Sequence, residues 1–206
     1  MLTSTYTLVA LSVEQTTARA ALQSLLDELC ALPGDFGTLA AGRAAQLTAA
    51  LRQVYDNYHW RKLDKFVVPA LRRSTPAADA LLAELDGLSG EAARAMDAAA
   101  ACVGTGDRPV PRAPFCRAVE RCIAALRRRL EREEHELFPL ARGAVGLDAW
   151  FAIANQMLAH DAYAQEHRGD PGRPAQAAAA PAAAVPVAAG TTVPDGRPRH
   201  ALLRAH

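Results

Sequence analysis

Apolar residues recur at helical spacing along most of the chain, in five segments that proline and glycine residues separate. The segments predict helices over about residues 12–32, 39–71, 77–103, 112–140 and 147–167. No segment of any length alternates with the period of two that is typical of a strand. Because long amphipathic helices with short connections pack as bundles, the pattern predicts an all-α fold. We expect an antiparallel up-down four-helix bundle with an extra short C-terminal helix.

Local signals set the expected helix ends. Ser12 and Gln15 have the spacing of a capping box, so we expect the first helix to begin near Ser12. Thr75 followed by Pro76 predicts the start of the third helix, with a capping hydroxyl and a proline at the first helical position. Pro69 is expected to kink or tighten the last turn of the second helix.

The end of the chain differs in composition from the rest. Residues 169–206 hold six of the 13 prolines and four of the 13 glycines, and their apolar letters are mainly alanine and valine. Small apolar side chains bury too little area to offset the entropy of ordering a chain. We therefore predict a helical domain over 1–168 and a disordered Pro/Ala-rich tail over 169–206. A short docking segment at Leu202 and Leu203 is the alternative to a plain solvated end.

Charge and cysteine usage exclude several classes. The chain has 23 Lys and Arg against 22 Asp and Glu, which is not the basic excess of a nucleic-acid-binding protein. The sequence contains no uncharged apolar stretch of about 18 residues, so it predicts no membrane span. Its first residues have no basic region typical of a secretory signal. The four cysteines lack CxxC spacing and are typical of reduced thiols. We expect a cytoplasmic protein with no nucleic-acid or membrane partner; an unidentified partner protein stays open.

Two segments resemble each other when they are aligned on their prolines. Residues 58–71 contain Pro69 and residues 128–141 contain Pro139, each late in a predicted long helix. The spacing of about seventy residues predicts a helical hairpin that is repeated within the chain. No P-loop, dinucleotide-binding fingerprint or nucleophile elbow is present, because the glycines do not follow predicted strands.

The second of these segments carries a family resemblance. Residues 133–139 read Glu-Glu-His-Glu-Leu-Phe-Pro, and the chain from about residue 8 to 166 resembles the hemerythrin-like (HHE cation-binding) family. The resemblance implies a four-helix bundle whose inner faces hold two iron atoms, with a His-x-x-x-Glu pair on the second and fourth helices. An imidazole and a carboxylate four residues apart share one helix face and suit iron.

The chain departs from that family pattern at several positions. His59 stands where the family has its first histidine, but Leu63 replaces the glutamate that should follow. Glu133 stands at the second glutamate, but Arg129 replaces its histidine. Asp64 is about 100° further round the helix than Leu63 and is a poor substitute. The resemblance thus leaves His59 and Glu133 as vestigial metal ligands, and we expect no bound cofactor.

The other helices also lack expected ligands. The family has histidines early in helices one and three, whereas this chain has residues 14–17, Glu-Gln-Thr-Thr, in the first and no histidine in the third. A guanidinium group cannot ligate a metal. We therefore expect Arg129 to pair with Glu133 in the space that the metal would occupy, which avoids an unpaired buried charge.

These residues predict a function without catalysis. We expect a hemerythrin-like protein with an eroded di-iron site that acts as a binding, sensing or scaffold module and is not an enzyme. The alternative is an iron protein that senses or carries O₂, NO or iron through a reduced ligand set of His59, Asp64, Glu133 and His160. A ferritin-like oxidase is disfavoured because the Glu-x-x-His pairs of that chemistry are missing.

Other reactive side chains have ordinary interpretations beside functional ones. His59 is either a ligand or a hydrogen-bonded core histidine, while His135, His160 and His167 are expected on solvated faces. Cys122 shares a helix face with Glu133 and is expected to be a small buried side chain. The arginines of residues 127–132 alternate with glutamates, which favours an ion-paired helix surface over a basic patch.

Overall fold

The computed structural model describes residues 2–32, 37–59, 61–104 and 108–167. For His59 and for several residues at the two ends of this range it describes the backbone alone. The predicted tail over 169–206 lies outside the described residues. The chain elements are α1 (Leu2–Cys30), β1 (Thr38–Leu39), α2 (Ala41–His59), the π-helix η1 (Leu63–Val67), α3 (Val68–Ser74), the 3₁₀-helix η2 (Pro76–Ala78), α4 (Asp79–Val103), β2 (Val110–Pro111), α5 (Arg112–Arg132), the π-helix η3 (Glu133–Leu137), α6 (Phe138–Ala144) and α7 (Leu147–His167).

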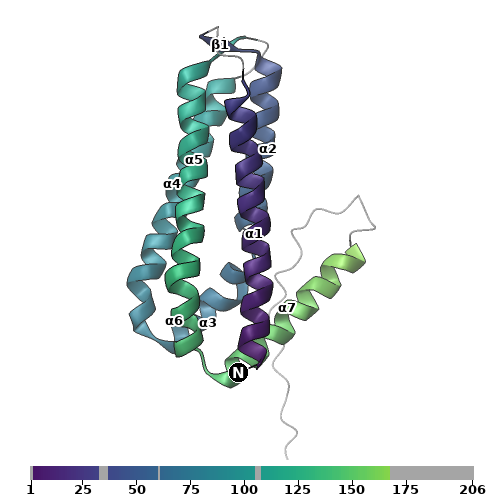
Figure 1. Cartoon of the computed structure of the whole chain (residues 1–206), viewed down its shortest axis with the longest axis vertical. Helices are drawn as coiled ribbons and strands as arrows, with labels where there is room; N and C mark the ends of the chain where they lie inside the picture. Colours follow the sequence, from purple (N-terminus) through teal and green to yellow (C-terminus); the bar gives the residue numbers. More distant parts are fainter. Residues whose placement is uncertain (1, 33–36, 60, 105–107, 168–206) are drawn as a thin grey trace, which may run out of the picture. The chain divides into compact units, whose positions relative to one another are not determined.

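Helices α1, α2, α4 and α5 lie side by side in the four-helix bundle (Figure 1). The all-α bundle that the sequence predicts is confirmed. Strands β1 and β2 form a two-residue antiparallel pair, with Leu39 opposite Val110, that joins the α1–α2 connection to the α4–α5 connection. Helix α7 packs against α1 and η1. None of the helices in the described part of the chain is long and apolar enough to cross a membrane.

The first helix begins ten residues before the predicted position. Helix α1 starts at Leu2, so Ser12 lies inside it and the capping box predicted there is wrong. The Ser12 hydroxyl donates to the Leu8 carbonyl at 2.9 Å, which is the usual partner of a serine in a helix interior. The Gln15 side chain is directed into the bundle. The apolar pattern before Ser12, with Leu8 and Leu11 buried, continues the helix toward the N-terminus.

The prediction of one continuous helix over 39–71 is also wrong. Helix α2 ends at His59, and after residue 61 the chain continues as η1 and α3. The N–H of Val68 donates to the Leu63 carbonyl, the i to i+5 bond of a π-helix. Pro69 has no N–H, and its ring would meet the carbonyl four residues earlier in an α-helix. The turn before the proline is therefore widened and not tightened.

The repeat that the prolines suggest is confirmed in detail. The N–H of Phe138 donates to the Glu133 carbonyl, again from i+5 to i, one residue before Pro139. Residues 63–74 and 133–144 each form a five-residue π-helix followed by a seven-residue α-helix with proline at its second position. π-Helical turns are rare and occur often at functional sites. Both of them border the centre of this bundle.

The apolar core falls into two clusters along the bundle. One cluster contains Leu22, Leu51, Ala92 and Leu126 among others, and lies toward the β1–β2 end. The other contains Leu11, Leu63, Leu85 and Leu137 among others, and includes Trp150 of α7. On α1 and α4 the two clusters are separated by a few residues of sequence, and after α2 and α5 the second cluster begins in η1 and η3. Between the two clusters lie the buried polar side chains of the site described below, among them Gln15, Arg129 and Glu133.

We predict that the cap of η2 stabilises the α4 end of the bundle. Thr75 accepts a hydrogen bond from the N–H of Ala77 at 3.2 Å, as its sequence position predicts. Thr75→Ala should lower the free energy of unfolding by about 1 kcal/mol because this N–H loses its acceptor. Thr75→Ser keeps the hydroxyl and should lose less than half of that amount. Urea denaturation of the three proteins checks the order, and equal losses in both variants would contradict it.

Candidate functional site

A layer of polar side chains crosses the middle of the bundle between the two apolar clusters. Every bundle helix contributes to it, and the segments after α2 and α5 contribute as well. We call the set the polar layer: Gln15, Tyr58, Arg61, Asp64, Ser89, Arg129 and Glu133. Glu133, Arg129 and Arg61 are 0%, 5% and 6% exposed. Charged side chains are almost never buried this fully unless they are paired.

Glu133 is the centre of the polar layer. Arg61 donates two hydrogen bonds to its carboxylate, from Nη1 to Oε2 at 2.8 Å and from Nη2 to Oε1 at 2.6 Å. Gln15 donates to Oε2 at 3.0 Å, and the Tyr58 hydroxyl donates to Oε1 at 3.4 Å. The paired bonds from Arg61 are the bidentate geometry in which guanidinium and carboxylate interact most strongly.

Arg129 links Glu133 to the rest of the layer. Its Nε donates to Glu133 Oε1 at 3.0 Å, four residues along the same helical segment. Its two terminal nitrogens donate to the Asp64 carboxylate and to the Ser89 hydroxyl. Asp64 also lies 3.5 Å from Arg61 Nη2. Two guanidinium groups and two carboxylates therefore share the layer, and its formal charge is zero.

Tyr58 completes the enclosure of the two arginines. The Arg61 guanidinium carbon lies 3.7 Å from the centre of the Tyr58 ring, and that of Arg129 lies 5.5 Å from it. A cation over an aromatic face is attracted by the ring, and the attraction grows when water is excluded. The same side chain therefore contacts Arg61 through its ring face and Glu133 through its hydroxyl.

The surroundings keep these groups in the charge states that the network needs. Burial lowers the pKa of Arg61, but the charge and hydrogen bonds of Glu133 raise it by more. For Arg129, burial again lowers the pKa, and Asp64 and Glu133 together raise it above the usual range. Burial, with Glu133 second, raises the pKa of Tyr58 far above its ordinary value, so its hydroxyl stays protonated and can donate.

A family model matches this part of the molecule. Residues 16–141, which include the second half of α1, the whole of α2, α4 and α5, and both proline segments, match the model of the hemerythrin HHE cation-binding domain. The chain belongs to this family. Searches of curated proteins and of solved structures gave no match. The matched range, whose family is described by its binding of cations, contains every residue of the polar layer except Gln15.

The side chains of the polar layer are not a suitable set of ligands for a bound metal cation. Both oxygens of Glu133 accept hydrogen bonds from guanidinium groups, which carry positive charge and have no lone pair to offer a metal. Within the ranges that the structure describes, no three His, Cys, Asp or Glu side chains gather where a metal ion could be held. The network satisfies Glu133 with the chain's own cations.

The residues singled out from the sequence have different positions. Glu133 is in the polar layer, and its expected pair with Arg129 is confirmed. His59 is the last residue of α2, and its side chain lies outside the described residues. Asp64 is in the layer as a partner of Arg129. His160 contacts the Phe66 ring edge-on, with the ring centres 5.8 Å apart, so it is half-buried and not on the solvated face that we expected.

The sequence missed Arg61 and the role of Gln15. Aligning the two proline segments pairs Arg61 with Glu131, which is an exposed residue, so the repeat gives no signal for a buried arginine. Gln15 lies in the part of the first helix where the family has a histidine, and that position was its only signal. Ser89 likewise lies in the third bundle helix, α4, and its hydroxyl accepts from Arg129.

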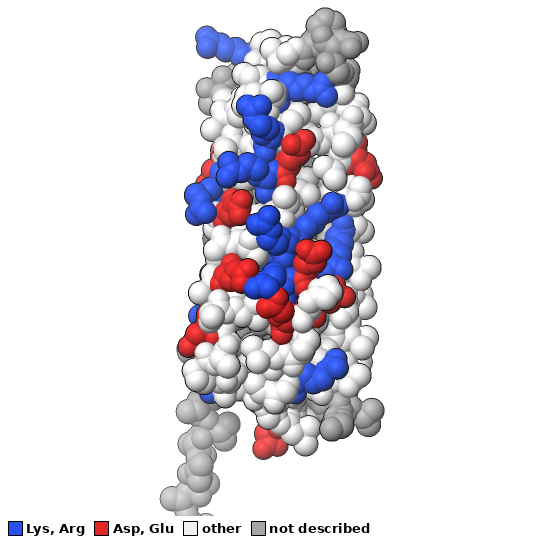
Figure 2. All heavy atoms as spheres, turned by 60° about the vertical axis from the view of Figure 1, so that its left-hand side comes forward, with Lys and Arg blue, Asp and Glu red and all other residues white. Residues whose placement is uncertain are grey.

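Ion pairs occur on the surface around the end of α5, as the alternation of arginine with glutamate predicts, and Arg127 donates to the Gln23 side chain there. Arg132 pairs with Glu84 and Glu136, and Arg19 pairs with Glu134 at 2.6 Å. Figure 2 shows basic and acidic side chains interspersed on one face of the molecule. Arg129 is the exception in this stretch because it points into the bundle. His135 is exposed and Cys122 is buried, as expected.

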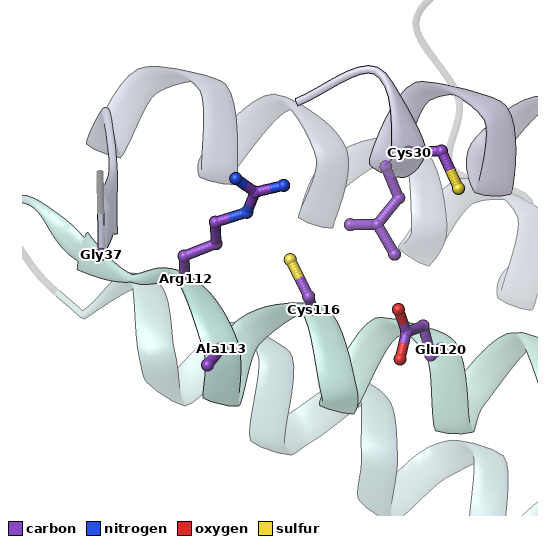
Figure 3. Close-up of a pocket in the computed structure, with 7 residues that line it drawn as sticks. Cys30, Gly37, Arg112, Ala113, Cys116 and Glu120 are labelled. Atoms are coloured by element: carbon purple, nitrogen blue, oxygen red, sulfur yellow. The ribbon is translucent and has the colours of Figure 1, made fainter. Parts of the chain in front are cut away.

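A separate cavity lies near the C-terminal end of α1 (Figure 3). Its volume is about 500 Å³, and it is lined by Leu29, Cys30, Gly37, Arg112, Ala113, Cys116 and Glu120. Arg112 donates to the backbone carbonyl of Leu32 at 3.1 Å and so holds the end of α1. Cys30 and Cys116 are free thiols. None of the lining residues belongs to the polar layer.

We predict that removing the charge of Glu133 destabilises the fold severely. Glu133→Gln keeps the shape but leaves Arg61 and Arg129 buried with too little negative charge, which should cost about 3–5 kcal/mol. Glu134→Gln is the matched control, since Glu134 is exposed and its ion pair should contribute less than about 1 kcal/mol. Urea denaturation compares the two. Similar losses in both variants would show that the buried pairs do not hold the layer together.

We predict an alkaline loss of stability that depends on Cys122. Burial raises the pKa of this thiol to about 12 from an ordinary 9.0. Above pH 9 the unfolded chain releases the proton while the folded chain keeps it, so the stability present below pH 9 falls as the pH approaches 12. Cys122→Ala should flatten this fall by at most about 1.4 kcal/mol per pH unit.

The control for this measurement is Val119→Ala, a buried truncation on the same helix that titrates no group. It should lower the free energy of unfolding at every pH and leave the slope of the wild-type protein unchanged. The slopes are obtained from urea denaturation at a series of pH values above pH 8. A slope in Cys122→Ala as steep as in the wild-type protein would contradict the assignment of this pH dependence to Cys122.

Proposed function

We propose that this hemerythrin-family chain works without a metal centre, as a non-catalytic binding, sensing or scaffold module. The observation that carries the proposal is the engagement of both Glu133 oxygens by Arg61 and Arg129. A di-iron site in a helical bundle needs several carboxylates and histidines that converge on one place. The chain has arranged the same region as an internally neutral network of ion pairs.

Displacing this network with a metal is unfavourable for two reasons. A cation at Glu133 would have to break the bidentate bonds of Arg61, and it would then lie beside two guanidinium charges in a region of low dielectric. The released arginines would in turn need other partners, since leaving a buried charge unpaired costs several kcal/mol. The two arginines thus occupy the space beside Glu133, and their charges would repel a metal cation placed there.

The burial of Glu133 supports a role without catalysis. A catalytic acid or base must reach the group whose proton it transfers. Glu133 is fully buried, and each of its oxygens already accepts hydrogen bonds from neighbouring side chains. We propose that the exterior of the bundle, and not its centre, contacts the biological partner, which is a protein and not nucleic acid or membrane. The four free cysteines support a cytoplasmic location.

Iron content tests the proposal. We expect protein purified from iron-replete cells to contain far less than one iron per chain by elemental analysis, and to show no absorption of an oxo-bridged iron pair. A hemerythrin-family protein that keeps its ligands, prepared in parallel, is the positive control. About two irons per chain would overturn the proposal and favour the alternative, an iron protein that senses or carries O₂, NO or iron through His59, Asp64, Glu133 and His160.

A further inference from the structure

The large apolar side chains that remain exposed are concentrated on two neighbouring helices. Among the described residues, all seven large hydrophobic side chains reported as exposed belong to α1 or α7. Their exposed fractions run from 47% to 64%. We call this set the α1–α7 face: Tyr6, Val9, Val13, Leu147, Phe151, Leu158 and Tyr163. Scattered apolar residues on a surface need no explanation, but a set confined to two packed helices does.

Most of these side chains form two stripes that meet. Tyr6, Val9 and Val13 are three and four residues apart on α1, and Leu147, Phe151 and Leu158 are four and seven apart on α7, so each trio shares a helix face. A shallow groove between the helices is lined by Tyr6 and Ala10 on one side and by Ala154 and Leu158 on the other. The apolar surface therefore continues from one helix to the other.

The α1 stripe has almost no charge along its own part of the helix. From residue 2 to residue 18 the only charged side chain is Glu14, and Lys62 pairs with it at 3.1 Å. Asp161, which borders the groove, pairs with the same lysine at 2.8 Å. Two such stripes can approach each other without opposing unpaired charges in their centre. This favours an apolar partner over a charged one.

The area is suited to a pair of identical faces. A half-exposed large apolar side chain presents roughly 100 Å² or slightly less, so the six side chains of the two stripes present on the order of 500 Å². A standard interface takes about 800 Å² from each partner, and polar rim atoms supply the remainder. The residues after 167 are a poor alternative occupant of the α1–α7 face. Apart from alanine, valine and proline, their only apolar side chains are Leu202 and Leu203.

We propose that the α1–α7 face is the interface of a homodimer, in which a second copy of this chain covers it through a two-fold axis. A two-fold interface uses the same surface on both copies, so the exposed stripes of one chain meet those of the other. The polar layer stays inside each bundle. The proposal is independent of the metal content of the bundle.

Analytical ultracentrifugation of the full chain tests the dimer. Between about 1 and 100 µM, a range typical of measurable association, we expect the wild-type protein to reach twice the mass of one chain. The double variant Val9→Glu, Phe151→Glu should raise the dissociation constant of the dimer by about 100-fold or more, because dimerisation would bury each new charge in the interface. Both positions are more than half exposed in the single chain, so folding should be unaffected.

The matched control adds the same charge elsewhere. Ala49 and Ala98 are exposed on α2 and α4, and Ala49→Glu with Ala98→Glu should leave the dissociation constant unchanged. Circular dichroism checks that both double variants are folded, and Leu158→Ser with Tyr6→Ser gives a milder disruption that should also weaken the dimer.

Three results would overturn the proposal. The first is a wild-type protein that stays a single chain at about 100 µM. The second is a Val9→Glu, Phe151→Glu variant that dimerises as tightly as the wild-type protein. The third is a single chain that co-sediments with vesicles of phosphatidylcholine and phosphatidylglycerol, because the α1–α7 face would then bind lipid.

Discussion

The buried carboxylate of Glu133 is the constraint on which the centre of this bundle depends. A carboxylate with no exposed surface is tolerated only when charges and hydrogen-bond donors surround it. Arg61 and Arg129 supply the charges, and Gln15 and Tyr58 supply further donors, so α1, α2 and α5 are all tied to one side chain. Ser89 brings in α4 through Arg129. The apolar core consists of two clusters on either side of this layer.

The centre of this hemerythrin-family bundle is neutralised by the chain's own side chains. The chain belongs to the hemerythrin HHE cation-binding family, and its own buried polar side chains lie between the two apolar clusters of the bundle. The positive charge in the described network comes from two arginines. Arginine suits the role because its planar fork matches a carboxylate and its charge persists when buried. Our proposal of a bundle without a metal centre, whose exterior contacts its partner, rests on this satisfied network.

The sequence predicted the helices and the pairing of Arg129 with Glu133, because helical periodicity and an i, i+4 spacing are local properties. It failed at Ser12, where a capping pattern lay inside a helix whose apolar face continued toward the N-terminus. It also failed near Pro69, because a missing N–H indicates an irregular turn without saying whether the turn tightens or widens. Arg61 was not predictable, since its partner Glu133 is 72 residues away and only the packed bundle brings them together.

A crystal structure of the full chain with anomalous data at the iron absorption edge, from crystals grown with ferrous iron, tests the central claim most directly. This one measurement shows the hydrogen-bond partners of Glu133 and any iron bound beside it. We predict that Arg61 forms its paired hydrogen bonds with Glu133, that Arg129 bridges Glu133 and Asp64, and that no anomalous peak lies within the polar layer. An anomalous peak bound by Glu133, with Arg61 turned away from it, would contradict the account.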